Sequence, residues 1–133
     1  MAAALQIGAS QAALVAAGAA AGAVLRWLAG LLLNPLWPHG FPLGTLLVNC
    51  LGGLLIGIAS VWYLRWPDEG LRLLLVTGFL GGFTTFSAFS AESLGLLHRG
   101  AWVMALLHSA AHLLGALACT AAGFALARWW WRG

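Results

Sequence analysis

The chain has 133 residues, of which 62% are hydrophobic and 7% are charged, and its formal net charge is +3 at pH 7. Soluble domains carry about 25% charged residues, so this composition excludes a soluble fold and indicates an all-α integral membrane protein. The sparse charge also excludes a nucleic-acid-binding surface. The length accommodates four spans of about 20 residues with short loops, and we expect a single four-helix transmembrane domain over residues 1–133.

The first span is predicted over about residues 4–33, a stretch dominated by alanine and glycine. Gly18 and Gly22 lie four positions apart, a spacing that lets two helices approach closely in lipid. The first basic residue of the chain is Arg26, near the far end of the apolar run. Because a signal peptide has its basic residues in front of the apolar run, we expect a retained span.

Arg26 has two interpretations of equal weight. With Trp27 beside it, it fits an interfacial residue that extends its charged end toward water. The apolar run continues to Leu33, however, which places Arg26 deeper than a free helix end and fits a water-filled vestibule.

A turn is predicted at residues 34–42, NPLWPHGFP, because prolines and glycine cannot continue a helix. The second span, over about residues 43–66, contains Asn49 as its one strongly polar side chain. A buried amide needs partners for its donors and its acceptor. Asn49 is therefore either a clamp between helices or a donor that faces a bound anion.

The third span, over about residues 71–97, contains the stretch TGFLGGFTTFSAFSAES. Gly81 and Gly82 interrupt its apolar run, and we expect a helix break near Gly81–Thr84 that frees backbone carbonyls from the helical ladder. Irregular backbone at membrane depth survives only when it is buried in protein or lines a cavity. This stretch is therefore predicted to line a pathway for a small solute.

Two stripes of side chains follow the third span at three-residue intervals. The aromatic stripe consists of Phe83, Phe86 and Phe89, and the hydroxyl stripe, one position further on, consists of Thr84, Ser87 and Ser90. Hydroxyl hydrogens and the electropositive edges of phenyl rings are weak donors that suit a small anion. Glu92, near the end of this span, is either an interfacial acid or a guard at a pore mouth.

The loop at residues 65–72, RWPDEGLR, holds two of the three acids and is predicted to be a charge-balanced turn. The fourth span, over about residues 101–131, carries His108 and His112 four positions apart, a spacing found in metal sites. No acid or cysteine on this helix completes a ligand set. We therefore expect interhelical hydrogen bonds or a wet vestibule there in place of a metal.

Four spans place both termini and the second loop on one side of the membrane. That side carries four arginines, namely Arg65, Arg72, Arg128 and Arg132. The other side carries Arg99, with Arg26 as a second member if it reaches that interface. This bias favours cytoplasmic termini but is weak enough for insertion in both orientations. Four spans of this size do not easily enclose a hydrated path, so we expect an oligomer, and an inverted pair would have two equivalent pathways.

The residue pattern favours transport over catalysis. No nucleophile–base pair, phosphate loop or dinucleotide fingerprint is evident in the sequence, so enzyme activity is not expected. Apart from Glu92 the spans contain no carboxylate, which makes proton-coupled cation export a poor fit. Carbonyls freed at the break in two inverted copies could converge and hold a small cation, which would offset the cost of placing anions in a low-dielectric interior.

Three segments together resemble one known family. GGFTTFSAFSAE in the third span, GTLLVNCLGG in the second and GAVLRW in the first are similar, in the same order, to the fluoride channel family (Fluc, also called CrcB). The resemblance implies small four-span subunits that form an antiparallel, dual-topology homodimer with two pores. Such channels lie in the cell inner membrane and export fluoride passively, which limits its toxicity to microbes.

The resemblance also implies roles for individual residues. The pore phenylalanines correspond to Phe86 and Phe89, the pore asparagine to Asn49 and the vestibule arginine to Arg26. A polar track is implied at Ser87, Ser90 and Thr120, and a structural sodium ion on the dimer axis is implied at the backbone carbonyls of Gly81 and Thr84. One departure affects the track, because a hydroxyl often found one turn before Thr120 is replaced here by Ala116.

Two alternatives remain from other classes. A small multidrug exporter would also have four spans, but it predicts an acid in the middle of the first span, where this chain has none. A non-transporting membrane assembly subunit would use the Thr/Ser-rich span as a packing face. Fluoride efflux from liposomes distinguishes the three.

Overall fold

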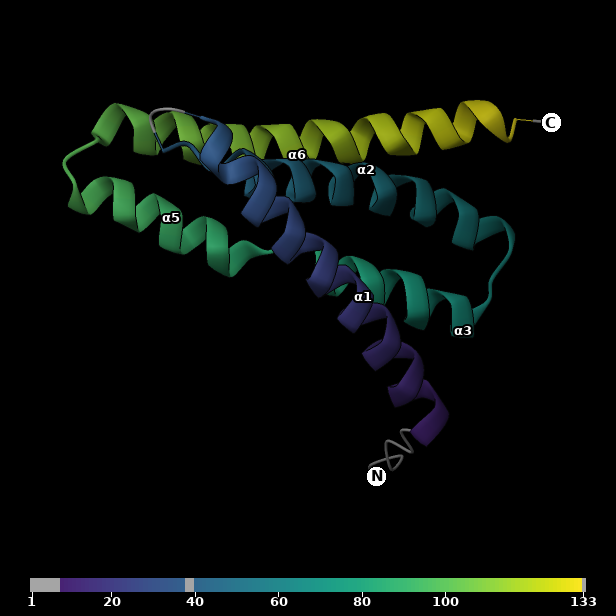
Figure 1. Ribbon diagram of the computed structural model, residues 1–133. Helices are drawn as coiled ribbons and strands as arrows, with labels where there is room; N and C mark the ends of the chain where they lie inside the picture. The colour runs from purple at the N-terminus through teal and green to yellow at the C-terminus, as the bar shows by residue number, and fades with distance from the viewer. Residues whose placement is uncertain (1–7, 38–39, 133) are drawn as a thin grey trace, which may run out of the picture.

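The computed structural model describes residues 8–37 and 40–132 (Figure 1). It contains four segments that are long and apolar enough to cross a membrane: Ala9–Leu36, Leu43–Arg65, Glu69–His98 and Trp102–Trp130. The expectation of an all-α membrane protein with four spans is confirmed. Residues 4–7 of the predicted first span lie outside the described part of the chain.

The first segment consists of α1 (Ala9–Leu33) and a short 3₁₀ turn, η1 (Asn34–Leu36). The second is α2 (Leu43–Arg65) and the fourth is α6 (Trp102–Trp130). In Figure 1, α2 and α6 lie side by side and run in the same direction, while α1 crosses the third segment obliquely. The chain therefore forms two helix pairs, α2 with α6 and α1 with the third segment. α2 also contacts α1 and so connects the two pairs.

The start of α2 shows how the predicted turn is tied to the helix that follows. Pro42 occupies the N-cap position and provides no side-chain cap. Asn34 takes over this role from the preceding turn, since its Oδ1 accepts hydrogen bonds from Gly44 N at 2.7 Å and Thr45 N at 3.3 Å. These N–H groups would otherwise lack partners at the helix N-terminus.

Small residues let the helices of each pair approach to backbone contact. A Cβ atom added to Gly57 of α2 would meet the backbone of Thr120 and Phe124 on α6, and one added to Gly123 would meet Leu54. On α1, Gly18 and Gly22 face the backbone of the third segment in the same way. The predicted small-residue pair on the first span is thus a packing contact, as expected for helices that associate in lipid.

The third segment is interrupted, but not at the glycines. It consists of α3 (Glu69–Leu71), the π-helix η2 (Arg72–Leu80) and α4 (Gly81–Phe83), followed after a gap by α5 (Phe86–His98). The gap is Thr84 and Thr85, whose backbones are extended, with φ/ψ of −86°/159° and −152°/121°. The predicted break near Gly81–Thr84 is therefore displaced: Gly81 and Gly82 stay helical, and Gly82 packs against Ala19 of α1.

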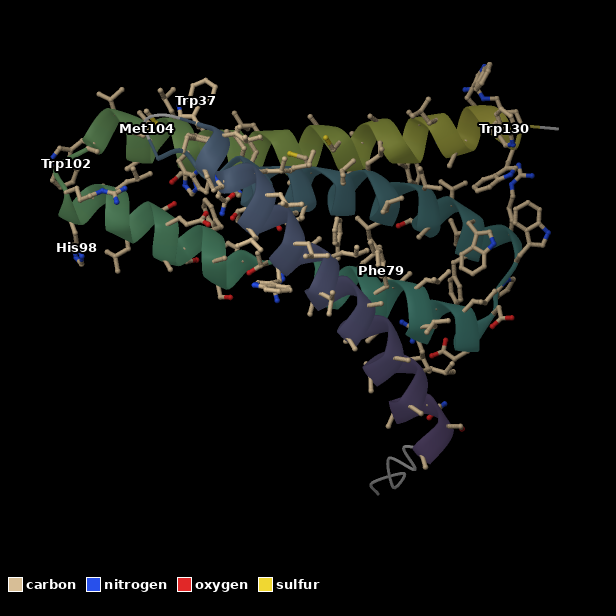
Figure 2. The ribbon with its side chains drawn as sticks, in the orientation of Figure 1. Trp37, Phe79, His98, Trp102, Met104 and Trp130 are labelled. Carbon is tan, nitrogen blue, oxygen red and sulfur yellow. The ribbon has the colours of Figure 1, made fainter. Side chains whose placement is uncertain are left out.

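Large apolar side chains cover the outer surface, as expected of a chain whose solvent is lipid. Tryptophans lie at both ends of α6, where Trp102 is 67% exposed and Trp130 is 74% exposed (Figure 2). Tryptophan is enriched at membrane–water interfaces, so these residues mark the two ends of the spans. In the second loop Arg72 and Glu69 form an exposed ion pair, which agrees with the predicted charge-balanced turn.

Candidate functional site

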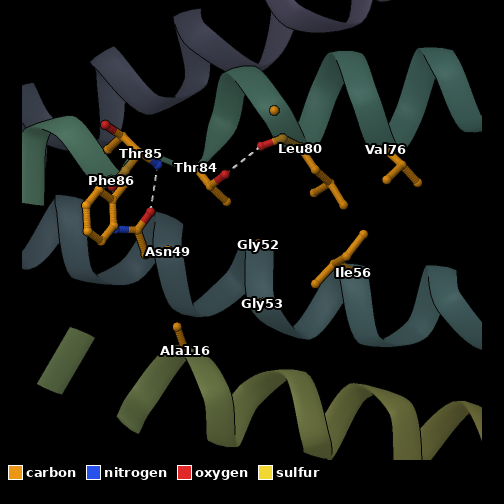
Figure 3. Close-up of a pocket in the computed structure, with 11 residues that line it drawn as sticks. Asn49, Gly52, Gly53, Ile56, Val76, Leu80, Thr84, Thr85, Phe86 and Ala116 are labelled. Carbon is orange, nitrogen blue, oxygen red and sulfur yellow. Dashed lines mark hydrogen bonds between the residues drawn. The ribbon is translucent and has the colours of Figure 1, made fainter. Parts of the chain in front are cut away.

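The break in the third segment is held open by Asn49 of α2 (Figure 3). Asn49 Nδ2 donates a hydrogen bond to Thr85 O at 2.9 Å, and Thr85 N donates to Asn49 Oδ1 at 2.8 Å. The side chain amide thus supplies the donor and the acceptor that a continuous helix would have supplied to Thr85. The clamp geometry is one of the two alternatives that the sequence left open for Asn49.

The helix resumes through an N-cap built from the second residue of the break. Thr85 Oγ1 accepts a hydrogen bond from Ala88 N at 3.1 Å, the side-chain-to-backbone contact that threonine commonly makes at a helix start. On the α2 side, Gly52 allows the close approach, because a Cβ atom there would collide with the Thr84 side chain. Thr84 and Thr85 form the break, and Gly52 lets α2 pack tightly against it.

Several backbone carbonyls lose their helical donors at the break. In a continuous α-helix Thr85 N would donate to Gly81 O, but it donates to Asn49 instead. The next carbonyl, Gly82 O, accepts a hydrogen bond from Arg26 Nε of α1 at 2.9 Å. Arg26 is half-buried and lies at the break, a position between the two interpretations that the sequence allowed for it.

A groove of about 420 Å³ lies between α2, α6 and the interrupted segment (Figure 3). Its walls include Asn49, Gly81, Thr84, Thr85 and Phe86. One space is therefore lined by both residues implied to hold sodium, by the implied pore asparagine and by one implied pore phenylalanine, although they come from different segments. Thr120 lies across the α2–α6 contact, where a Cβ atom on Gly53 would approach its Oγ1.

The predicted aromatic stripe does not form one face. Phe83 is buried and stacks on Phe79, with ring centroids 5.5 Å apart. Phe86 is 79% exposed, and its ring centroid lies 5.4 Å from that of Phe89 beyond the break. The expectation of a continuous stripe is wrong because the extended residues between Phe83 and Phe86 remove the helical periodicity on which it depended.

Hydroxyl groups of the predicted hydroxyl stripe and of the implied polar track bond within their own segments. Thr84 Oγ1 donates to Leu80 O at 2.8 Å, Ser90 Oγ to Phe86 O at 2.8 Å, and Thr120 Oγ1 to Ala116 O at 2.9 Å. Ser87 Oγ lies 3.3 Å from Thr85 Oγ1. A hydroxyl has one hydrogen that can rotate, so Thr84, Ser90 and Thr120 can donate to an anion only by releasing their carbonyl partners.

Glu92 takes part in a buried network between α2, α5 and α6. Its Oε1 accepts a hydrogen bond from Thr45 Oγ1 at 2.6 Å, and its Oε2 lies 3.2 Å from His108 Nε2. His108 is fully buried, and its Nδ1 lies 2.8 Å from Ser93 Oγ. Glu92 is thus directed between the helices, which differs from the interfacial acid that was one of its two interpretations from the sequence.

His112, one turn further along α6, connects this network to the break. Its Nδ1 lies 3.1 Å from Asn49 Nδ2, and its ring centroid lies 4.8 Å from that of Phe89. Phe89 also stacks on His108, with an interplanar angle of 16°. Of the two alternatives expected for the histidines, interhelical hydrogen bonds or a wet vestibule, the structure shows the hydrogen bonds.

The sequence analysis did not identify the acid that lies beside the two histidines. Ligand atoms of Glu92, His108 and His112 all lie within 4.8 Å of one another, although no acid lies on the histidine helix itself. Glu92 comes from α5, and only the antiparallel return of the chain through the Arg99–Ala101 turn brings it beside His108.

Comparison with known proteins gives a consistent result. The family model described as "CrcB-like protein, Camphor Resistance (CrcB)" matches residues 13–124. A curated protein of Bordetella petrii, named "Fluoride-specific ion channel FluC", is 56% identical over 115 residues, which cover 85% of this chain and 88% of that protein. Proteins with the same name from Aromatoleum aromaticum and Pasteurella multocida are 53% and 47% identical, covering 90% and 87% of this chain and 91% of each relative.

Proposed function

Because this chain belongs to the CrcB-like protein family, we propose that it is a fluoride channel that exports fluoride passively and so lowers its toxicity in the cytoplasm. It is a multi-pass membrane protein and a channel rather than an enzyme. The relatives named fluoride-specific channels cover most of the chain, which favours this function over a small multidrug exporter or an assembly subunit.

The observation that carries the proposal is the interrupted third segment. The extended residues Thr84 and Thr85 place Phe86 in one groove with Asn49 and Gly81. The ring centroid of Phe89 lies 5.4 Å from that of Phe86. Phenyl edges and hydroxyl hydrogens are weak donors, and conduction needs sites that an ion can leave as readily as it enters. The hydroxyl groups of Ser90 and Thr120 already bond to backbone carbonyls, so their interaction with an anion has a built-in competitor that keeps the binding shallow.

Within this path we assign Asn49, Phe86, Phe89, Ser87, Ser90 and Thr120 to the fluoride pore and Arg26 to its vestibule. The half-buried guanidinium of Arg26, next to Gly82 O, supplies positive charge at the break. The charge of the guanidinium attracts anions to the vestibule, which suits a residue that concentrates fluoride.

The exposed face of the break supports an oligomer. Phe86 is 79% exposed and Gly81 has open space at its Cβ position, yet lipid-exposed irregular backbone does not occur within the hydrocarbon region. We propose that a second, inverted copy covers this face in the cell inner membrane, giving an antiparallel dual-topology homodimer. Two equivalent pores follow from the two-fold axis.

A sodium ion fits the donor chemistry at the same face. The Thr85 N–H that would have bonded to Gly81 O donates to Asn49, and both Gly81 and Thr84 line the groove. Backbone carbonyls are the oxygen ligands that a hard cation accepts. We propose that the carbonyls of Gly81 and Thr84 from both copies hold a structural sodium ion, whose charge offsets the cost of placing anions in the low-dielectric interior.

The proposal is tested by fluoride efflux from liposomes. Purified protein should release fluoride when a potassium ionophore clamps the voltage, and it should exclude chloride. Phe86→Ile and Phe89→Ile should each slow the release, whereas Phe124→Ile, a change in a phenylalanine of α6 beside Arg128, should not. Well-inserted protein that releases no fluoride would refute the proposed function, and unchanged rates in both pore variants would remove the phenyl rings from the mechanism.

A further inference from the structure

Three side chains able to bind a metal ion lie together beside the break, and they come from two helices. His108 and His112 lie one turn apart on α6, with ring centroids 4.5 Å apart. No acid lies on α6 itself, but the packing of α5 against α6 supplies Glu92. One ligand atom from each of the three lies within 4.8 Å of the other two. Two histidines four positions apart on a helix, joined by a carboxylate from elsewhere, are a ligand set that binds zinc.

The distance between the first two ligands already suits a small metal ion. Glu92 Oε2 lies 3.2 Å from His108 Nε2. Bonds from zinc to nitrogen and oxygen are about 2.0–2.2 Å long, so two ligands of a tetrahedral zinc ion lie about 3.3–3.5 Å apart. An ion can therefore replace the hydrogen bond between these two atoms with little movement of either helix.

The third ligand is a buried atom that has no other partner. His112 Nε2 has no hydrogen-bond partner among the described residues, and the residue is 4% exposed. Buried polar atoms without partners are few in native proteins, and each one calls for an explanation. The other ring nitrogen, Nδ1, lies 3.1 Å from Asn49 Nδ2, which can only donate. A metal ion on Nε2 places the ring proton on Nδ1, so the ion competes with the Asn49 amide for His112.

The other two ligands have the supporting contacts that metal ligands usually make. His108 Nδ1 lies 2.8 Å from Ser93 Oγ, which lies 3.3 Å from Ser109 Oγ. A hydroxyl oxygen accepts as well as donates, so Ser93 can accept the Nδ1 hydrogen when Nε2 binds a metal. Thr45 Oγ1 donates to the second carboxylate oxygen of Glu92 at 2.6 Å. Such outer contacts fix the orientation of metal ligands.

A groove gives an ion a way to the three ligands from the end of the spans. The side chain of Glu92 is 24% exposed, and it lines a groove of about 460 Å³ together with Asn34, Gly40 and Arg99. Asn34 and Gly40 lie between α1 and α2, and Arg99 caps the end of α5. The groove therefore opens beside the connecting segments, and its carboxylate is the first ligand that an entering cation meets.

We propose that Glu92, His108 and His112 form a Zn²⁺ site, and that the bound ion blocks the fluoride path beside it. This inference rests on the proposed function. The Phe89 ring stacks on His108 and lies 4.8 Å from His112, with both distances measured between centroids or planes of the rings, and Asn49 loses its bond to His112 when zinc binds. Three protein ligands also leave a fourth position open. Fluoride held there by a divalent cation would lie in a deep well, and conduction needs sites that an ion can leave.

The binding test is a calorimetric zinc titration of the full-length protein, without a histidine tag, in lipid nanodiscs. Wild type should bind one zinc ion per chain, with nitrogen and oxygen ligands at about 2.0–2.2 Å in X-ray absorption at the zinc edge. Glu92→Gln and His112→Gln should each weaken binding at least about tenfold. His98→Gln, a change in an exposed histidine at the end of α5, should not. Equal zinc affinity in wild type and both ligand variants overturns the inference.

Fluoride efflux from liposomes tests the block. Micromolar zinc should slow release by wild type and by His98→Gln at least about tenfold, and a chelator should restore it. Zinc is supplied on both sides of the membrane, because the grooves of the proposed inverted pair open on opposite sides. Glu92→Gln and His112→Gln should each keep most of their own zinc-free rate.

The outcomes separate this inference from the proposed function. Unslowed efflux from zinc-loaded wild type, or an equal block of wild type and both ligand variants, overturns the inference and leaves the fluoride channel intact. Absence of efflux from wild type without zinc refutes the proposed function itself. The zinc titration then still decides whether Glu92, His108 and His112 bind the metal.

Discussion

Replacing Asn49 with alanine removes the side chain that bonds to both backbone groups of Thr85 at the break. A group left buried without its partner costs about 1–3 kcal/mol, whereas interhelical hydrogen bonds between side chains in membrane proteins average about 0.6 kcal/mol. The larger figure applies better here, because the extended backbone leaves Thr85 without a helical replacement. Because Thr85 is only half-buried, we take about 1–2 kcal/mol for each of its two groups, which gives a loss of about 2–4 kcal/mol.

This loss should be visible at the break itself. Amide hydrogen exchange at Thr85 should accelerate by about 30-fold to 700-fold in Asn49→Ala, since 1.4 kcal/mol corresponds to about a factor of ten. The matched control is Ser60→Ala on the same helix, whose exposed hydroxyl bonds only to Ile56 O of its own turn. If exchange at Thr85 is the same in wild type and Asn49→Ala, the amide does not hold the break and the reasoning is refuted.

Two further predictions concern packing and the proposed ion. Gly57→Val should lower the free energy of unfolding, measured by titration with a denaturing detergent, by at least about 2 kcal/mol, because its side chain would meet the backbone of Thr120 and Phe124. The control is Gly95→Ala, which has open space at its Cβ position. Equal effects of the two changes would argue against the α2–α6 contact. Replacing sodium with a bulky organic cation during purification should weaken the dimer and lower fluoride efflux, measured by size exclusion and by the liposome assay, and unchanged dimer and efflux would remove the sodium ion from the proposal.

The sequence predicted the class and the course of the chain well. Apolar runs of the right length, separated by proline- and charge-bearing turns, give four spans whose bounds agree with the structure to within a few residues. Small residues four positions apart marked a true helix contact at Gly18 and Gly22. These features can be predicted from one segment at a time, because the length of an apolar run and the spacing of its glycines are both contained in that segment.

The break was predicted near Gly81–Thr84 and lies at Thr84 and Thr85, so the prediction has the right span and overlaps the observed break at Thr84. Glycine has the freedom to leave a helix, which pointed to Gly81 and Gly82, yet both stay helical and Gly82 serves the close contact with α1. The helix opens instead at Thr84 and Thr85. There a partner on another helix, Asn49, replaces the lost hydrogen bonds of Thr85, and no local pattern in the third span contains that information.

The amino-acid sequence by itself determined that this is a four-span membrane protein with an interrupted, hydroxyl-rich third segment and, through its motifs, the family to which it belongs. Only the tertiary structure decided that Glu92 meets His108, that Arg26 meets Gly82 and that Asn49 links Thr85 to His112. In lipid, each buried polar group must find a partner within the protein. That partner can lie many residues away on another helix, so the pairing appears only when the helices are packed together.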